Sequence, residues 1–138
     1  MTITLDHTIV HAHDPAATAE FLARILGLAA PRRLGHFTVV DVGPTSLDLM
    51  PSNGPVSSRH FAFLVSEEQF DEILGRLQSA GIPYRADPFH REPDAINSWD
   101  DGRGVYFDDP NGHVLEVLTR RYGSGGLDAK NVNPLLRS

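Results

Sequence analysis

The sequence predicts an α+β fold in which two βαβββ modules form one curved mixed sheet, a cup, with helices on its outer face. Three observations lead to it. Short apolar runs have the length and composition of strands, the first run of each half precedes an amphipathic helical segment, and both halves repeat the same order. His60 stands in the second half where His7 stands in the first, and Gly81 matches Gly27.

The first half begins with a strand that contains His7. Asp14-Pro15 then marks a helix start, because proline suits the first helical turn, and Gly27 marks the helix end. Apolar residues at helical spacing fill the segment between them. The expected strands of this half are 5–10, 31–34, 37–40 and 47–50, and the expected helix is 16–25.

The second half repeats this order, with Ser66 as the expected helix cap and Gly81 as the helix end. A hairpin turn is expected at 109–112, where Pro, Asn and Gly follow Asp. The extra length of this half falls in the polar stretch 88–102. The expected strands are 60–65, 83–86, 105–107 and 113–119, and the expected units are a first module at 1–54, a second at 55–122 and a flexible tail at 123–138 within one structural domain.

Composition excludes several classes of protein. The formal net charge of -6 gives no indication of a nucleic-acid partner. The absence of cysteine excludes disulfides, thiolate metal sites and a cysteine nucleophile. The N-terminus does not have the pattern of a signal peptide, and no apolar run is long enough to span a bilayer, so we expect a cytoplasmic protein without membrane contact.

Four titratable residues stand inside the expected strands, at related places in the two halves. Strand side chains alternate between faces, and this alternation puts His7, Asp48, His60 and Glu116 on the face opposite the helices. A charged group in a strand core is costly unless it is paired or bound. Two histidines and a carboxylate can bind one face of a divalent metal and leave positions open for oxygen ligands.

Two segments then resemble a known group of proteins. They are Leu5-Asp6-His7-Thr8 near the start and the run from Val105 to Glu116, Val-Tyr-Phe-Asp-Asp-Pro-Asn-Gly-His-Val-Leu-Glu. The chain resembles the vicinal oxygen chelate superfamily over residues 4–122. That superfamily includes glyoxalase I, bleomycin-resistance proteins, fosfomycin-resistance thiol transferases and extradiol dioxygenases. The resemblance implies paired βαβββ modules, a divalent metal ion (Fe, Mn, Zn or Ni), a small-molecule substrate and a homodimer.

The resemblance also implies a ligand set. His7, His60 and Glu116 would bind the metal, and Asp48 would be either a fourth ligand or a hydrogen-bonding partner of one. Tyr106 has the spacing of a tyrosine that contacts substrate in extradiol dioxygenases and fosfomycin enzymes.

Further candidates follow from their places in the chain. His11, on the cup face, and His90, in the extra segment, are candidates for proton transfer. Trp99, Phe89 and Met50 are expected to line the substrate pocket, and Met50 shares the face of Asp48.

The leading hypothesis is a divalent-metal enzyme that binds a substrate through two vicinal oxygens, with a lean to an extradiol-type dioxygenase. One alternative is a glyoxalase-like isomerase or lyase, and another is a metal-free, bleomycin-resistance-like binding protein. Fosfomycin modification is disfavoured, because Ile9 replaces a threonine of those enzymes and the chain's one lysine is Lys130. Residues 44–59 contain no extra histidine of the kind that extradiol dioxygenases use.

Overall fold

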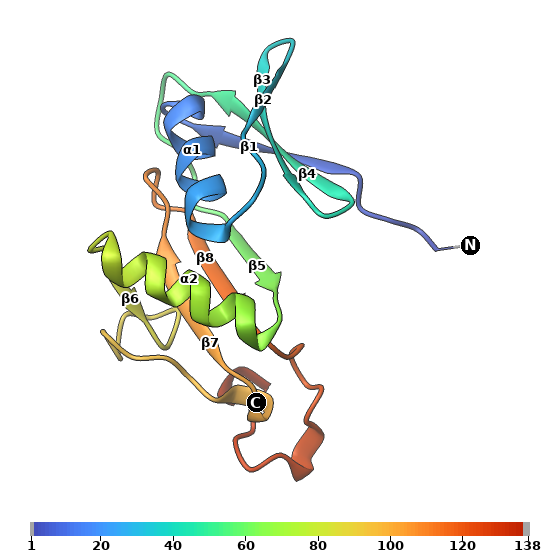
Figure 1. The fold of residues 1–138 in the computed structure, drawn as a ribbon, viewed down its shortest axis with the longest axis vertical. Coiled ribbons are helices and arrows are strands. Elements are labelled where there is room, and N and C mark those ends of the chain that lie inside the picture. Colours follow the sequence, from blue (N-terminus) through green and yellow to red (C-terminus); the bar gives the residue numbers. More distant parts are fainter. Residues whose placement is uncertain (1, 137–138) are drawn as a thin grey trace. The chain divides into compact units, whose positions relative to one another are not determined.

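The computed structural model describes residues 2–136, which form two compact units. Each unit contains a four-stranded mixed sheet and one long helix (Figure 1), which confirms the predicted architecture of two βαβββ modules. The first unit runs to Ser58 and also includes Asp109–His113, and the second comprises Arg59–Asp108 and the chain from Val114 onward. The boundary therefore differs from the expected one at residue 54.

The sheet of the first unit has the order β1-β4-β3-β2, with β1 parallel to β4 and the other neighbours antiparallel. Helix α1 packs against β1, β3 and β4. Asp14 caps the helix by accepting the Ala17 N–H at 3.1 Å, and Gly27 ends it with a φ of 71°. The elements are β1 (His7–Ala12), α1 (Pro15–Leu26), β2 (Arg32–Leu34), β3 (Phe37–Val42) and β4 (Thr45–Pro51).

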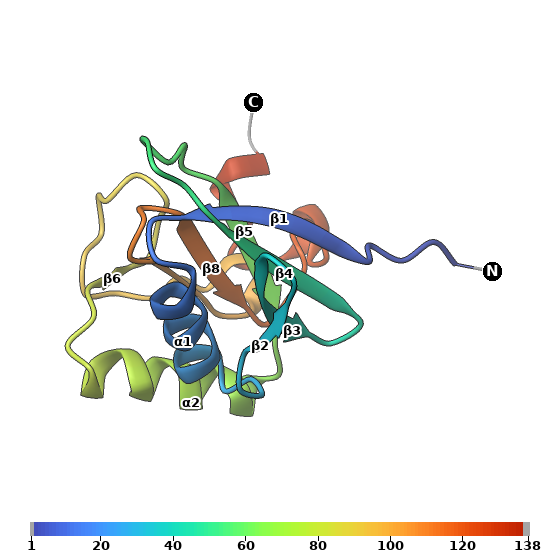
Figure 2. The same ribbon diagram turned by 90° about the horizontal axis from the view of Figure 1, so that it is seen from above.

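The two faces of this sheet differ as the alternation predicts. Val10, Leu47 and Leu49 are buried on the face that α1 covers (Figure 2). His7 and Ile9 are exposed on the opposite face. Burial of the apolar face against α1 is the main favourable term in forming this unit.

The sheet of the second unit has the order β5-β8-β7-β6, with β5 parallel to β8. Ser66 starts α2 with a capping box, in which its side chain and that of Gln69 each accept the other's backbone N–H. Phe70, Ile73 and Leu77 are the buried residues of this helix. The elements are β5 (His60–Leu64), α2 (Glu67–Ser79), β6 (Tyr84–Arg85), β7 (Gly104–Asp108) and β8 (Val114–Leu118).

The turn between β7 and β8 belongs to the first unit because its side chains bond there. The Asn111 side chain accepts the His13 N–H at 2.8 Å and donates to the Thr18 hydroxyl at 2.9 Å. The buried His113 imidazole lies 2.8 Å from the carbonyl oxygen of His11. These bonds explain why a turn read from sequence as part of the second module clusters with the first.

A long loop between β6 and β7 is fastened at its far end by a clasp between Asn97 and Gly104. Their backbones exchange hydrogen bonds of 2.9 and 3.1 Å. The buried Asn97 amide also donates to the Ala86 carbonyl at 2.9 Å, and its oxygen accepts the Trp99 N–H at 3.2 Å. The clasp therefore holds the backbone of Trp99 in place at the end of the loop.

The chain after β8 folds back onto the short 3₁₀ turn Trp99–Asp101 (Figure 1). The Asp101 carboxylate accepts the N–H groups of Lys130 and Asn131 at 3.1 and 2.9 Å. We call the segment 123–131 the strap. The glycines at its start suggested a flexible linker, yet its backbone N–H groups are held by carboxylates of that turn.

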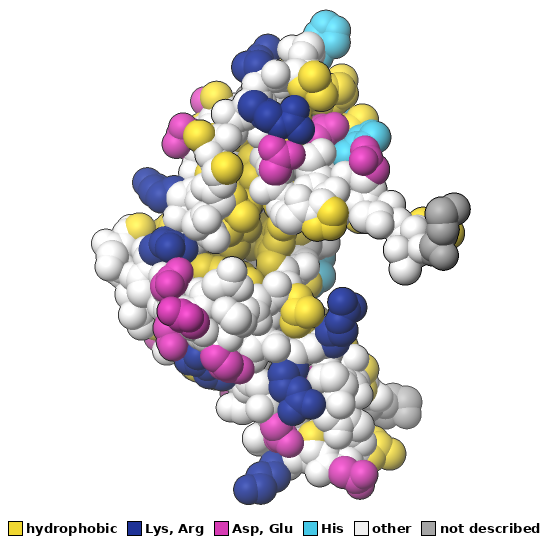
Figure 3. Space-filling model, turned by 45° about the vertical axis from the view of Figure 1, so that its right-hand side comes forward, with side chains coloured by type: hydrophobic (Ala, Val, Ile, Leu, Met, Phe, Trp, Pro, Cys, Tyr) yellow, Lys and Arg dark blue, Asp and Glu magenta, His cyan; other side chains and the backbone are white. Residues whose placement is uncertain are grey.

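Charges of both signs lie interspersed over the surface of each unit on the face that Figure 3 shows, in keeping with the modest net charge. Among the described residues, no helix has both the length and the apolar composition needed to cross a bilayer.

We expect Gly104→Ala to destabilise the second unit. A Cβ at this position would lie 2.8 Å from Asn97 Oδ1, and Asn97 is held by its bond to Ala86. The displacement costs about 1–3 kcal/mol in the free energy of unfolding, measured by urea denaturation. Gly54→Ala is the matched control, because no atom lies within 4 Å of its added Cβ. Equal stability of the two variants would contradict this account of the clasp.

We expect Asp101→Gly to release the strap, because it removes the carboxylate at a φ of 60° that glycine also adopts. The amides of Lys130 and Asn131 should then exchange faster with deuterium, whereas Asp94→Gly, at a φ of 57°, should change nothing there.

The same contact should depend on pH. The hydrogen bond from the Asn131 backbone N–H is the main cause of the lowered pKa of Asp101. The contact therefore stabilises the strap above the ordinary carboxyl pKa and is lost as pH falls below about 4. Equal protection of the Lys130 and Asn131 amides at pH 2 and pH 6, after correction for the intrinsic pH dependence of exchange, would contradict this expectation.

Candidate metal and substrate site

His60 and Glu116 lie side by side on the inner face of the second sheet, the face that does not meet α2. The parallel register pairs Ala62 with Glu116, and His60 lies two residues earlier on the same face. The His60 Nε2 and Glu116 Oε1 atoms are 3.1 Å apart. The Glu116 side chain is 1% exposed, so this pair brings a carboxylate into a nearly water-free position.

The hydrogen-bond partner of His60 Nδ1 determines whether Nε2 of the same ring is a donor or an acceptor. Nδ1 lies 2.9 Å from the carbonyl oxygen of Val114, which can only accept, so Nδ1 carries the hydrogen. In a neutral ring, Nε2 then presents its lone pair to Glu116 Oε1, which is also an acceptor. Two acceptors at this distance require a shared cation, either a proton or a metal ion. A backbone carbonyl on the far nitrogen is the arrangement that metal-binding histidines use, so these residues fit a divalent metal.

Two tyrosine hydroxyls continue the network from Glu116. The Tyr122 hydroxyl lies 2.8 Å from Oε1 and 2.7 Å from Oε2, and it donates its one hydrogen to this carboxylate. The Tyr106 hydroxyl lies 2.6 Å from that of Tyr122. Burial, first of all, raises the pKa of both hydroxyls, and the charge of Glu116 acts in the same direction. Both tyrosines are therefore protonated donors at neutral pH.

Aromatic rings surround this network. The His60 ring stacks with that of Tyr106 at 6.0 Å between centroids, with an angle of 18° between the planes. Trp99 meets Tyr106 and Tyr122 edge-on, at 6.0 and 6.5 Å. The network thus combines buried polar groups with aromatic rings packed beside them.

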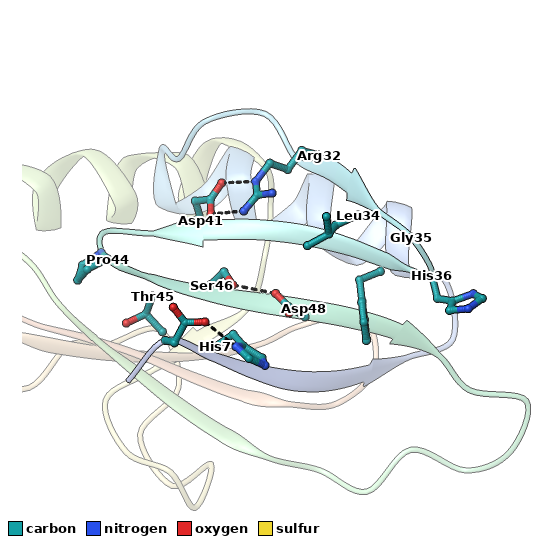
Figure 4. Close-up of a pocket in the computed structure, with 12 residues that line it drawn as sticks. His7, Arg32, Leu34, Gly35, His36, Asp41, Pro44, Thr45, Ser46 and Asp48 are labelled. Carbon is teal, nitrogen blue, oxygen red and sulfur yellow. Dashed lines mark hydrogen bonds and ion pairs between the residues drawn. The ribbon is translucent and has the colours of Figure 1, made fainter. Parts of the chain in front are cut away.

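The first unit carries His7 in an open cavity of about 690 Å³ (Figure 4). His7 is half exposed, and its Nδ1 lies 2.7 Å from Asp6 Oδ2. This bond is the largest cause of a raised pKa for the imidazole. Nearby, Asp48 is 8% exposed and accepts the Ser46 hydroxyl at 2.8 Å. The cavity also contains the ion pair of Arg32 and Asp41, along with Leu34, Gly35, His36, Phe37, Pro44 and Thr45.

The remaining predicted residues lie at several places. In the first unit, His11 and Met50 are exposed and face each other across β1 and β4. In the second unit, Phe89 and Trp99 line one cavity of about 530 Å³. His90, with a φ of 59°, lines a separate cavity of about 200 Å³ beside Arg85 and Asp108.

The structure thus brings His60, Glu116, Tyr106 and Trp99 together within one unit. His7 and Asp48 share the cavity of the other unit. Across residues 2–136 no group of three or more His, Asp or Glu side chains is arranged to hold a metal ion, so the third ligand stays a prediction.

Sequence reasoning missed Tyr122. Tyr122 lies beyond the end of β8 at Leu118, where the alternation of a strand no longer tells which way a side chain points. The glycines directly after it suggested the start of a linker.

Comparison with known proteins places the chain in a family. The family model described as "Glyoxalase/Bleomycin resistance protein/Dioxygenase superfamily" matches residues 4–117. The chain is 34% identical over 102 residues to "Metallothiol transferase FosB" of Shouchella clausii (strain KSM-K16), an alignment covering 67% of this chain and 64% of that relative. The chain therefore spans slightly less than two thirds of the length of that relative.

Two solved structures are more similar. "Oxidase ChaP-H1" is 56% identical, covers 89% of this chain and all of its own, and superposes with a TM-score of 0.86. "Oxidase ChaP-H2" is also 56% identical, covers 91% of this chain and all of its own, and gives a TM-score of 0.88. Because the family model matches most of the sequence, this chain belongs to the glyoxalase/bleomycin resistance protein/dioxygenase superfamily.

Proposed function

We propose that the chain is a divalent-metal-dependent oxidase or oxygenase that acts on a small aromatic substrate with two neighbouring oxygens. The observation that carries the proposal is the contact between His60 Nε2 and Glu116 Oε1, which a proton satisfies and which also suits a divalent metal ion bound by both atoms. The 56% identity to two proteins named oxidases supports oxidation as the reaction class. An extradiol-type ring cleavage is the form of this chemistry that the sequence favours.

In this proposal His60 and Glu116 are ligands, and His7, in the first unit, supplies the third. When bound, the metal would polarise the two substrate oxygens, stabilise their deprotonated form and, if it is Fe(II), admit dioxygen. Asp48 is proposed as a hydrogen-bonding partner of a ligand, because its carboxylate already accepts the Ser46 hydroxyl.

The remaining side chains handle the substrate in this proposal. Tyr106 and Tyr122 hold protons close to Glu116, and Trp99 offers a flat apolar surface to an aromatic ring. His11 and His90 are kept as candidates for proton transfer. The proposed assembly is a homodimer, as is common in the superfamily.

A metal-dependent thiol transferase is the second candidate, favoured by the 34% identity to a metallothiol transferase. Against it, Ile9 stands exposed on the His7 face where the fosfomycin enzymes have a threonine. Metal-dependent consumption of glutathione or cysteine without dioxygen would favour the transferase.

The metal prediction concerns protein purified without an affinity tag or chelator. We expect about one divalent metal ion per chain by plasma mass spectrometry, since the proposed ligand set would bind one ion. His60→Ala, Glu116→Ala and His7→Ala should each lose the metal, because each removes a ligand. His13→Ala is the control, since this exposed histidine is outside the proposed ligand set. Metal retained in the ligand variants would refute this ligand set, and a parent without metal even after reconstitution would leave a metal-free binding protein.

The substrate prediction concerns oxygen consumption. The Fe(II)-loaded protein should consume dioxygen, measured with an oxygen electrode, when supplied with catechol-type diphenols. Matched monophenols should give no consumption above background, because a single hydroxyl cannot occupy two metal positions. Glu116→Ala should abolish the response to diphenols. Equal rates with monophenols and diphenols would contradict recognition through two vicinal oxygens.

A further inference from the structure

We infer that Tyr122 is a positioning residue of the proposed metal site: its hydroxyl holds Glu116 Oε2 and thereby presents Oε1, the oxygen beside His60 Nε2, to the metal. This inference rests on the proposed function, since it concerns how one proposed ligand is held. It assigns a role to a residue outside the strands and outside the ligand set.

The hydrogen-bond distances distinguish the two carboxylate oxygens of Glu116. Oε1 lies 3.1 Å from His60 Nε2 and 2.8 Å from the Tyr122 hydroxyl. Oε2 lies 2.7 Å from the same hydroxyl, whereas the contact with His60 is made by Oε1. A hydroxyl has one hydrogen to give. When a cation is bound at Oε1, the Tyr122 hydroxyl donates its hydrogen to Oε2.

The neighbouring tyrosine fixes the direction in which Tyr122 donates. An ionised carboxylate can only accept, so the hydrogen of Tyr122 points to Glu116. The Tyr106 hydroxyl, at 2.6 Å, must then donate to the Tyr122 oxygen. Tyr106 is 1% exposed, so its ring has no freedom to leave this position. The order of donation is therefore Tyr106 to Tyr122 to Glu116, and each bond polarises the next.

The strap explains how a partly exposed residue can position a buried one. The Tyr122 side chain is attached beyond the end of β8, and its residue is 42% exposed. Directly after it, Gly123 and Gly125 donate their N–H groups to the Asp100 carboxylate at 3.1 and 3.3 Å. Asp100 is 1% exposed and belongs to the turn that also carries Trp99, whose edge meets the Tyr122 ring.

Loss of the hydroxyl should weaken metal binding without removing a ligand. Partners that orient a ligand typically contribute tenfold to hundredfold to metal affinity. In Tyr122→Phe, Glu116 Oε2 would lose its hydrogen bond while remaining buried. The carboxylate could then adopt a second orientation.

The experiment measures Mn²⁺ affinity of the metal-free full chain by electron paramagnetic resonance of the free ion. We expect the Kd of Tyr122→Phe to rise roughly tenfold over the parent. Tyr84→Phe is the matched control, because its hydroxyl accepts a hydrogen bond from the Gln78 side chain, outside the proposed ligand set, and its loss should leave the Kd unchanged. Thermal unfolding of each variant checks that the fold is kept.

A double-mutant cycle separates positioning from general loosening. Tyr106 acts on Glu116 through Tyr122, so Tyr106→Phe should raise the Kd less than Tyr122→Phe, and the double variant should bind like Tyr122→Phe alone. If Tyr122→Phe does not fold, the rise in Kd for Tyr106→Phe decides the matter. Additive effects, or a parent-like Kd for Tyr122→Phe, would overturn the inference and leave the proposed function standing. A parent that binds no Mn²⁺, Fe²⁺, Zn²⁺ or Ni²⁺ would overturn both.

Discussion

The buried carboxylate of Glu116 is the constraint on which the second unit depends. A sheet interior of low polarity penalises an ionised group by several kcal/mol unless hydrogen bonds or a cation compensate it. Here an imidazole, a tyrosine hydroxyl and, behind it, a second tyrosine converge on that single group. The loop before β7 brings Trp99 against the rings of Tyr106 and Tyr122, and the strap begins directly after Tyr122. Much of the irregular chain in this unit is thus organised around one charge.

Alternation along strands allowed the sequence to predict which side chains share a face. It placed His60 with Glu116 and Tyr106, because register in a sheet conserves parity even when strand ends shift by a residue or two. The helices were equally predictable, because a capping residue stands at the start of α1 and α2 and a glycine stands at the end of each. These features depend on neighbours only a few positions apart in the chain.

Features that depend on distant partners were not predictable in the same way. Glycines at 123–126 have the composition of a linker, and nothing local shows that Asp100 and Asp101 accept the backbone N–H groups of the strap. Those aspartates adopt left-handed backbone angles, which aspartate tolerates better than most residues. The turn before β8 likewise joins the first unit through Asn111, a contact spanning most of the chain.

The clasp between Asn97 and Gly104 also bears on how such a protein can change over generations. Because the far end of the loop is tied to β7 by reciprocal backbone bonds, the ten or so residues before it can vary in length and chemistry while the sheet stays intact. Phe89 and the residues around it thus form a replaceable wall beside Trp99. Substitutions in that wall would reshape the cavity beside Trp99 without removing any group of the buried network at Glu116.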